Sequence, residues 1–214
     1  TPNNTSPQCQ LWFAGNRLNI CNGYFFCIAM FIINEKNIRI TYLANHDSLT
    51  GLATLHLMHE RFELARQMAN RSEKLMALLF IDLDYFKSVN DTFGHDTGDA
   101  VLKEVAIRLQ KEIRESDTAC RIGGDEFAII LQNVSTDELE KIIVRILDNI
   151  RLIKIPNETS LTLTSSIGSS FVTQFVEGIT INQVLKVADQ ALYQAKNQGR
   201  NQWVNKDFST NFSD

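Results

Sequence analysis

Two short clusters of acidic residues lie where the chain could present them to a ligand. Asp82–Asp84 (Asp-Leu-Asp) ends an apolar run, and Asp125–Glu126 directly follows Gly123–Gly124. If the two segments belong to neighbouring strands, Asp82 and Asp125 converge, and two close carboxylates need a cation or a shared proton between them. Oxygen donors without His or Cys favour magnesium, which usually completes its shell with substrate phosphates. Two solvated acidic turns are the alternative interpretation.

The glycine pair Gly123–Gly124 predicts a hairpin turn, and a turn without side chains also lets a nucleotide approach the backbone closely. The chain contains no GxxxxGK[ST] loop, which excludes a P-loop nucleotidase. Phe86 and Lys87 occupy positions where an EF-hand loop needs an oxygen ligand and a glycine, so Asp82–Asp84 does not begin a calcium loop of that kind.

Apolar spacing predicts the elements that must position these clusters. Helices alternate with strands in the order β-α-α-β-β-α-β-α-β after a first helix, which implies an α/β fold with a mixed central sheet flanked by helices. The expected elements are a helix from Leu52 to Met68, a strand buried on both faces at Met76–Ile81, helices at Tyr85–Gly94 and Gly98–Ile113, strands at Thr118–Ile122 and Glu126–Leu131, a helix capped by Ser135 and Glu138, a half-buried strand at Leu161–Ile167, a helix capped by Thr180 and Gln183, and a strand at Gln202–Val204.

The chain has 214 residues, of which 44% are hydrophobic and 21% charged, the balance of a soluble globular protein. Its net charge of −4 argues against a general nucleic-acid binder. The four cysteines fit no metal or redox spacing and are expected to be buried thiols of a reducing cytoplasm: Cys9, Cys21, Cys27 and Cys120.

The first 43 residues differ in character from the rest, because they are aromatic and rich in cysteine. We expect two strands there, Gln10–Phe13 and a buried Tyr24–Ile33, in a piece too short to bury its own core. No stretch reaches about 18 apolar residues, so no complete transmembrane helix is expected. The chain begins at Thr1 without methionine, and we expect it to belong to a longer protein with a sensor or membrane anchor upstream. The expected domains are residues 1–43, 44–205 and a polar tail, 206–214.

Several motifs together resemble the GGDEF family of diguanylate cyclases. The segment 121–127 (RIGGDEF) contains the family signature. The further matches are 47–52 (DSLTGL), 82–87 (DLDYFK), 90–95 (NDTFGH), Gly98–Asp99, 191–193 (ALY), Lys196 and 199–201 (GRN). The resemblance implies a palm-like sheet similar to that of nucleotidyl cyclases and polymerases. It also implies an enzyme that joins two GTP molecules into cyclic di-GMP, releases two pyrophosphates, and works as the cytoplasmic part of a sensor or membrane-anchored protein.

The resemblance also implies a role for each matched residue. Asp82 and Asp125, with the Leu83 carbonyl, would hold two Mg²⁺ (or Mn²⁺) ions in each active site. Asp125 or Glu126 is the expected general base, assisted by the metal, and Arg121 is a further catalytic residue. The expected GTP-binding residues are Phe86, Lys87, Gly123, Gly124, Lys196 and Arg200, with Asn90, His95 and Asp99 at the guanine, where a carboxylate excludes ATP.

Arg114 and Asp117 form an RxxD motif five residues before Gly123, the spacing at which the family binds its own product as an inhibitor. An exposed ion pair at a helix end is the alternative interpretation. Each active site of the family holds one GTP, so the resemblance also implies a homodimer. No nucleic-acid partner is expected, and any membrane contact would be made through a segment upstream.

Two parts of the chain depart from the family pattern. Thr54–Leu55 replaces an Asn-Arg pair outside the metal cluster, which puts local packing in doubt. Residues 31–47 loosely resemble the end of a PAS sensor domain joined to a cyclase, and the tail of a membrane segment is the alternative. Two other functions stay open: a non-catalytic receptor for GTP or cyclic di-GMP, and a cyclase with a hybrid or mononucleotide product.

Overall fold

A computed structural model describes residues 28–72, 75–155, 162–172 and 178–208. The chain divides into two compact units, one ending at Ala44 and the other running from Asn45 to Asp214. The second unit holds the following elements: α2 (Leu55–Ser72), β1 (Met76–Asp84), α3 (Phe86–Phe93), α4 (His95–Glu112), β2 (Thr118–Gly123), β3 (Glu126–Gln132), α5 (Thr136–Arg151), β4 (Thr164–Val172), α6 (Ile181–Asn197) and β5 (Trp203–Asp207).

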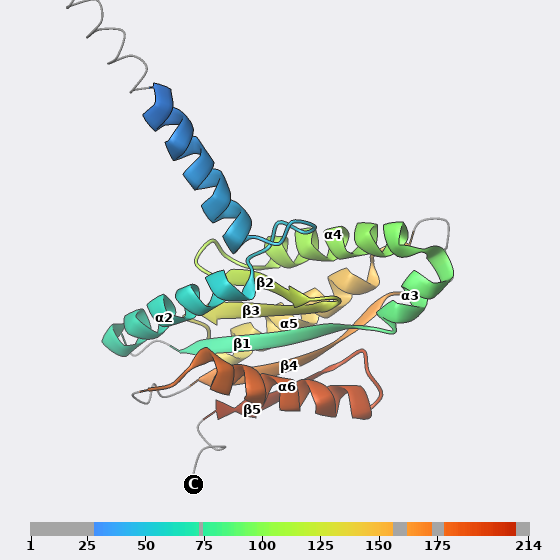
Figure 1. Ribbon diagram of the computed structural model, residues 1–214. Coiled ribbons are helices and arrows are strands. Elements are labelled where there is room, and N and C mark those ends of the chain that lie inside the picture. Colours follow the sequence, from blue (N-terminus) through green and yellow to red (C-terminus); the bar gives the residue numbers. More distant parts are fainter. Residues whose placement is uncertain (1–27, 73–74, 156–161, 173–177, 209–214) are drawn as a thin grey trace, which may run out of the picture. The chain divides into compact units, whose positions relative to one another are not determined.

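The five strands form one mixed sheet in the order β2-β3-β1-β4-β5, with β1 at its centre. All neighbouring pairs are antiparallel except β4 and β5, which run parallel. One face packs against α3, α4 and α5, and the other packs against α2 and α6 (Figure 1). The predicted fold class and element order are therefore confirmed.

The central strand β1 is buried along its whole length, because helices cover both faces of the sheet. Its side chains alternate: Leu79 and Ile81 enter the core beneath α4 and α5, whereas Leu78 and Phe80 enter the core beneath α2 and α6. The same period of two carries Asp82 to the face of α2 and α6. The alternation thus decides which helices surround the acidic end of the strand.

The two predicted helix caps are present as reciprocal capping boxes. The Ser135 side chain accepts a hydrogen bond from the backbone N–H of Glu138, and the Glu138 side chain accepts one from the backbone N–H of Ser135. Helix α5 begins directly after Ser135. Thr180 and Gln183 do the same for α6. Local sequence chemistry is sufficient to fix both starting points.

The predicted half-buried strand at Leu161–Ile167 is wrong in its burial and its extent. The observed strand runs from Thr164 to Val172, with every residue after the first buried. Residues 162 and 163 precede it, and residue 161 lies outside the described residues. The apparent alternation came from the leucines and threonines at residues 161–164. Ser165 and Ser166, which follow, are polar yet buried in β4. Gly168 faces α6, where an added Cβ would lie 2.0 Å from the Ala188 carbonyl oxygen, so the helix backbone packs directly on the strand.

A helix runs over residues 28–45, and all of it except its last residue belongs to the unit that ends at Ala44. The expected buried strand at Tyr24–Ile33 is therefore wrong for residues 28–33, which are helical and exposed, and residues 24–27 lie outside the described part. The expected strand at Gln10–Phe13 also lies outside it. A run of apolar residues this short does not distinguish a strand from a helix by its pattern alone. No described helix is both long and apolar enough to cross a membrane.

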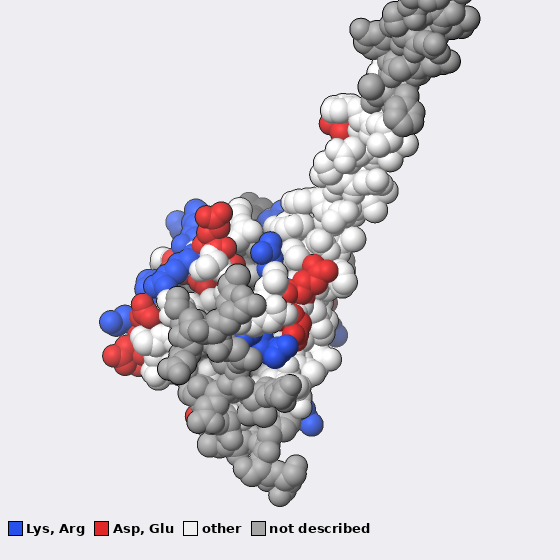
Figure 2. Space-filling model, turned by 90° about the vertical axis from the view of Figure 1, so that its left-hand side faces the viewer, with Lys and Arg blue, Asp and Glu red and all other residues white. Residues whose placement is uncertain are grey.

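Charged side chains of both signs lie side by side on the face of the molecule shown in Figure 2. Patches of Lys and Arg atoms and patches of Asp and Glu atoms lie near one another there, with uncharged residues between them (Figure 2). A face of mixed sign creates little long-range field, because opposite charges cancel over a distance comparable to the screening length.

Candidate active site

The two acidic clusters meet at one end of the sheet. Asp82 of β1 and Glu126 of β3 are direct partners in the antiparallel ladder. The preceding residue, Asp125, lies in the turn between β2 and β3, and its carbonyl oxygen accepts a hydrogen bond of 3.4 Å from the Leu83 backbone N–H. Three carboxylates thus gather where β1 ends, and each is held by backbone pairing rather than by a flexible loop.

Burial and mutual repulsion raise the pKa of two of these acids. Asp82 is 9% exposed, and burial raises its pKa, with the charge of Asp125 adding to the rise. The ammonium of Lys196, 2.8 Å from Asp82 Oδ2, opposes that rise. Burial also raises the pKa of Glu126, and the charges of Asp82 and Asp125 raise it further. This corner therefore has an excess of negative charge that a single lysine does not neutralise.

The donors at this corner suit a hard divalent cation. In the parts of the chain that the structure describes, no three His, Cys, Asp or Glu side chains are grouped as a metal site. A cation beside Asp82 and Asp125 would therefore need further oxygen ligands from a main-chain carbonyl, water or substrate phosphate. Mg²⁺ normally binds in this way, through one or two carboxylates and a substrate. The excess negative charge and the all-oxygen donors fit such an ion.

The second acid of the first cluster, Asp84, has a different role from Asp82. Its carboxylate accepts hydrogen bonds from the hydroxyls of Thr164 (2.8 Å) and Ser166 (2.7 Å) and from the backbone N–H of Asn201 (3.0 Å). It therefore ties β1 to β4 and to the turn after α6. Sequence analysis named Asp82–Asp84 only as one acidic cluster, and no signal in the sequence identified these three partners of Asp84.

Tyr85 connects the end of β1 to the turn after α6. It has a positive φ of 58°, uncommon for a tyrosine, and its exposed ring lies 4.8 Å from the guanidinium carbon of Arg200. Arg200 and Asn201 also have positive φ values, 63° and 49°. The Arg200 cation is thus held over an aromatic face next to the acidic corner, an arrangement that sequence analysis did not predict.

Arg121 braces the glycine turn. Its Nε and Nη2 atoms donate to the Gly124 carbonyl oxygen at 3.0 and 2.8 Å, and Nη1 lies 3.0 Å from Asp47 Oδ1. Burial alone would raise the pKa of Asp47, but hydrogen bonds from Thr50 and Arg121 outweigh burial and lower it. Arg121 thus links segment 47–52 to the turn of the GGDEF segment, because its guanidinium contacts Asp47 on one side and the Gly124 carbonyl oxygen on the other.

The residues expected at the guanine lie on α3 and α4, which follow β1. Asn90 packs against Gly98, where an added Cβ would lie 1.9 Å from Asn90 Oδ1 and 3.2 Å from the Phe86 ring. Phe86, the first residue of α3, is buried, whereas the next residue, Lys87, is exposed. His95 and Asp99 are also exposed, in the first turns of α4. The contact of Asn90 with Gly98 places the amide beside the turn that carries Asp99.

Arg114 and Asp117 lie in the loop between α4 and β2. Asp117 accepts hydrogen bonds from the backbone N–H groups of Arg114 and Gln132, both at 3.0 Å. Arg114 Nη2 lies 3.2 Å from Glu138 Oε1, and its side chain is 60% exposed. The carboxylate therefore shapes the loop. Among the described residues, the guanidinium is held by one exposed ion pair, which a ligand could replace.

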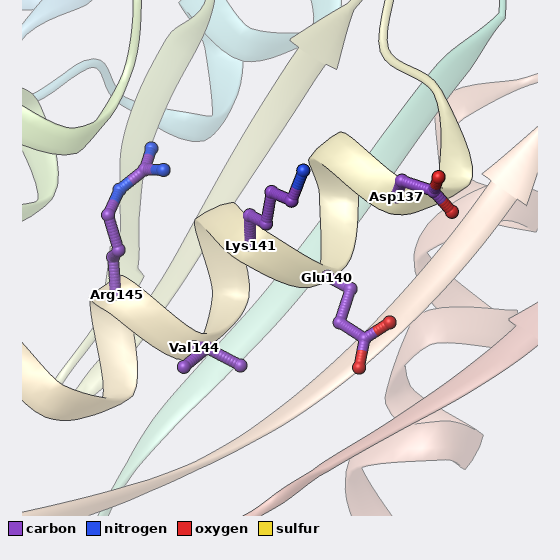
Figure 3. Close-up of a pocket in the computed structure, with 5 residues that line it drawn as sticks. All are labelled: Asp137, Glu140, Lys141, Val144 and Arg145. Carbon is purple, nitrogen blue, oxygen red and sulfur yellow. The ribbon is translucent and has the colours of Figure 1, made fainter.

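A separate hollow of about 500 Å³ lies on the outer surface of α5 (Figure 3). All five labelled residues come from this one helix, with Asp137 towards one end and Arg145 towards the other. Arg145 is paired with Glu112, 2.7 Å away. No residue of the acidic corner lines this hollow, so its geometry does not connect it with the chemistry there.

Comparisons with known proteins show which family this chain belongs to. The family described as "Diguanylate cyclase, GGDEF domain" matches residues 44–202. The response regulator PleD of Caulobacter vibrioides is 38% identical over 167 residues, which cover 77% of this chain and 36% of PleD. The diguanylate cyclase TpbB of Pseudomonas aeruginosa is 35% identical over 175 residues, 78% of this chain and 39% of TpbB. The chain thus spans well under half the length of these two relatives.

A solved structure shows the same fold. The coiled coil and GGDEF domain of DgcB from Caulobacter crescentus, in complex with c-di-GMP, superposes with a TM-score of 0.80 and 25% sequence identity. The match covers 87% of this chain and 98% of that one. The likeness therefore extends over nearly the whole of that solved chain.

Proposed function

Because the chain belongs to the GGDEF diguanylate cyclase family, we propose that it condenses two molecules of GTP into cyclic di-GMP and releases two pyrophosphates. The observation that carries the proposal is the group formed by Asp82, Asp125 and Glu126 at one end of the sheet, with Lys196 beside it. The pKa values of Asp82 and Glu126 are raised by burial and by repulsion between the carboxylates. Acids with raised pKa values are common at binding and catalytic sites.

Asp82, Asp125 and the Leu83 carbonyl would hold the metal, which we propose to be two Mg²⁺ (or Mn²⁺) ions. When bound, such ions activate the attacking 3′-hydroxyl and stabilise the leaving pyrophosphate. Glu126 and Asp125 are the acids placed to accept the hydroxyl proton. The raised pKa of Glu126 makes its carboxylate a stronger base than an ordinary glutamate, although still weak for a ribose hydroxyl, so it would depend on help from the metal.

The triphosphate would lie against the glycine turn. A Cβ placed on Gly123 or Gly124 would meet no atom within 4 Å, so the space above both residues is open to a ligand. Lys196 already faces Asp82, and the Arg200 guanidinium is held over Tyr85. With Lys87, these cations would offset the phosphate charge. Phe86 would support the same site from the start of α3, and Arg121 would hold the turn in shape.

Specificity for guanine would come from the pair of helices after β1. Asp99 can accept hydrogen bonds from N1–H and the exocyclic amine of guanine, a donor pair that adenine does not offer. The contact of Asn90 with Gly98 holds the Asn90 amide close to the turn that bears Asp99. His95, the first residue of α4, would support the segment that carries Asp99.

The product needs two chains, since each site would hold one GTP. We propose that the chain works as a homodimer in which two such sites face each other. The helix of residues 28–45 supports this, because it exposes large apolar side chains that water solvates poorly. They are Ile28, Met30, Phe31, Ile32, Ile33, Ile38, Ile40, Tyr42 and Leu43. Arg114 and Asp117 would bind the product as an inhibitor, with Arg114 exchanging its exposed partner Glu138 for the ligand.

Product analysis tests the proposal. The purified chain is incubated with GTP and Mg²⁺, and the products are separated by chromatography. We expect cyclic di-GMP from the parent chain and from an exposed-surface control, Asp137→Ala, but none from Asp125→Ala. Absence of product from the parent chain, with GTP or cyclic di-GMP still bound, would contradict the proposal and favour a receptor.

A further inference from the structure

The turn after α6 carries Arg200 in a backbone conformation that most residues avoid. Gly199, Arg200 and Asn201 have successive positive φ values of 119°, 63° and 49°. Glycine adopts such values freely and asparagine tolerates them, whereas the Cβ of an arginine makes them unfavourable. A turn of this kind persists only where the surrounding structure holds it in place. The contacts of the turn therefore decide where the Arg200 guanidinium lies.

The inner side of the turn is held by α6 and by β1. The Arg200 backbone N–H donates to the Ala195 carbonyl oxygen at 3.1 Å, and the Gln202 side-chain amide donates to the same oxygen at 2.9 Å. The Asn201 backbone N–H donates to Asp84 Oδ2 at 3.0 Å. These bonds engage the backbone N–H groups of Arg200 and Asn201 and leave the Asn201 carbonyl and side-chain oxygens for another partner.

Arg151, the last residue of α5, is that partner. Its Nε atom donates to Asn201 Oδ1 at 2.8 Å, and its Nη2 atom donates to the Asn201 carbonyl oxygen at 3.3 Å. Its third nitrogen, Nη1, is paired with Asp148 on the same helix. Because a guanidinium is planar and presents its donors as a rigid fork, it holds Asn201 at two atoms and opposes rotation of the residue.

The contact joins parts of the molecule that are distant in the chain. Arg151 lies 50 residues before Asn201, and none of the motifs matched in the sequence includes it. Helix α5 covers one face of the sheet and α6 covers the other (Figure 1). The side chain of Arg151 therefore ties the two helical layers together beside Asp84, at the end of β1.

We propose that Arg151 is a positioning residue for the cyclase reaction, because its hold on Asn201 fixes the turn that presents the Arg200 guanidinium to the phosphates of GTP. The Tyr85 ring would orient the guanidinium itself, and Arg151 would fix the backbone that carries it. Arg151 would not touch the nucleotide, since its three nitrogens already contact Asn201 and Asp148. This inference rests on the proposed function, which takes Arg200 as a ligand of the triphosphate.

The test measures turnover, binding and stability separately in the whole chain. KM and kcat for GTP with Mg²⁺ are obtained from initial rates of cyclic di-GMP formation at a fixed protein concentration. Calorimetry measures binding of a GTP analogue with a methylene group between its α- and β-phosphates, which cannot release pyrophosphate. Urea denaturation measures stability. The variants are Arg151→Ala, Arg151→Lys, Arg200→Ala, the double variant Arg151→Ala/Arg200→Ala and the control Arg145→Ala, which removes an arginine of α5 that pairs with Glu112 on α4.

We expect Arg151→Ala to raise KM and to weaken analogue binding about 3- to 10-fold, the change that corresponds to one net hydrogen bond, while kcat changes less. Arg151→Lys should lie between Arg151→Ala and the parent, because an ammonium cannot reproduce the fork. Because Arg151 would act through Arg200, the double variant should bind no more weakly than Arg200→Ala alone. Arg145→Ala should keep the KM of the parent, whatever its effect on stability.

Three outcomes would overturn the inference. The first is parent-like KM and analogue binding in Arg151→Ala. The second is a double variant that loses the product of the two single fold-changes, since Arg151 would then act apart from Arg200. The third is an equal loss of binding in Arg151→Ala and Arg145→Ala, which would make Arg151 a general stabilising residue.

Failure of the proposed function is distinguishable from these outcomes. It would appear as absence of cyclic di-GMP from the parent chain. If that chain still binds the analogue, the binding series alone decides the role of Arg151. If the parent chain neither forms product nor binds the analogue, the inference falls together with the proposed function.

Discussion

The acidic residues at the end of β1 occupy positions that lower the stability of the fold. Asp82 and Glu126 are adjacent in the ladder, with Asp125 in the turn beside them, and Lys196 is the cation paired with Asp82. A raised carboxyl pKa means that the folded chain holds the proton more tightly than the unfolded chain. Stability therefore falls as pH rises from the ordinary value of the acid through the raised value.

This linkage predicts the effect of Glu126→Gln. The pKa of Glu126 is raised from its ordinary value of 4.5 by burial and by Asp82 and Asp125. At pH 7 and without divalent metal, removal of the charge should raise the melting temperature, and the gain should shrink as pH falls through the raised value towards 4.5. Thermal unfolding followed by circular dichroism across this pH range measures the difference.

Glu138→Gln provides a control of opposite sign. Hydrogen bonds from Ser135 and Arg114 lower the pKa of Glu138, and glutamine can still take part in the capping box. This variant should melt below the parent at neutral pH, and the deficit should fade in acid. Equal pH profiles for Glu126→Gln and the parent would contradict the account of the acidic corner.

The Tyr85 ring is expected to position the Arg200 guanidinium, which lies over it. Asparagine accepts a positive φ better than most residues, so Tyr85→Asn removes the ring without adding backbone strain. We expect KM for GTP to rise about 2- to 5-fold, the value of one exposed cation–π contact, with a smaller change in kcat. Tyr85→Phe keeps the aromatic face and should behave like the parent. A change in kcat alone would argue against a role in positioning Arg200.

At the scale of elements, the active corner depends on how closely α6 and the turn after it approach the sheet. Gly168 lets α6 lie directly on β4, and Asp84 ties the turn at Asn201 to β1. Lys196 lies one turn beyond Leu192 on α6, so the close packing of α6 at Gly168 helps to bring its ammonium to Asp82. Gly168, which lies just beyond the strand expected from the sequence, is the residue that allows this close approach.

Gly168→Ala tests this packing. The added methyl would lie 2.0 Å from the Ala188 carbonyl oxygen and 2.2 Å from the Leu192 nitrogen, which are backbone atoms that cannot rotate away. We expect a loss of about 3 kcal/mol or more in the free energy of unfolding, the upper part of the usual range for overpacking. Urea denaturation measures this loss.

Ser170→Ala on the same strand is the matched control. The Ser170 hydroxyl is buried without a hydrogen-bond partner among the described residues, so its removal should be neutral or slightly stabilising. A wild-type midpoint for Gly168→Ala would show that α6 can move away from the sheet at little cost.

At the scale of the whole molecule, catalysis would require two chains to meet. The rate per chain should then rise with protein concentration, because the fraction of dimer rises. Ile38→Glu on the exposed helix should raise the half-maximal concentration about tenfold or more, since burying one isoleucine contributes about 1.5–3 kcal/mol. Sedimentation velocity and initial rates over a dilution series measure both quantities.

Ile107→Glu is the control, because Ile107 is another exposed isoleucine, on α4. It should leave the concentration dependence unchanged. A rate per chain that does not vary with concentration, in a preparation that stays monomeric, would contradict the requirement for a dimer.

Much of the fold could be predicted from the sequence because its signals are local. Helical periodicity, the capping boxes at Ser135 and Thr180 and the glycine turn each depend on residues close together in the chain. The errors came where local pattern is ambiguous. Alternating leucines and threonines at residues 161–164 suggested a half-buried strand, although β4 is buried after its first residue. The apolar run at residues 28–33 looked like a strand although it is helical.

The sequence by itself determined the family, the order of the elements and the residue types of the acidic corner, because motifs and periodicity are properties of neighbouring residues. Only the tertiary structure decided which groups meet. Asp82 lies opposite Glu126 in the sheet and forms an ion pair with Lys196, whereas Asp84 accepts a hydrogen bond from a serine of β4. Arg121 donates hydrogen bonds to the glycine turn, and Arg151 donates hydrogen bonds to Asn201 in the turn after α6. These contacts join segments far apart in the chain, and strand order, register and helix packing bring them together.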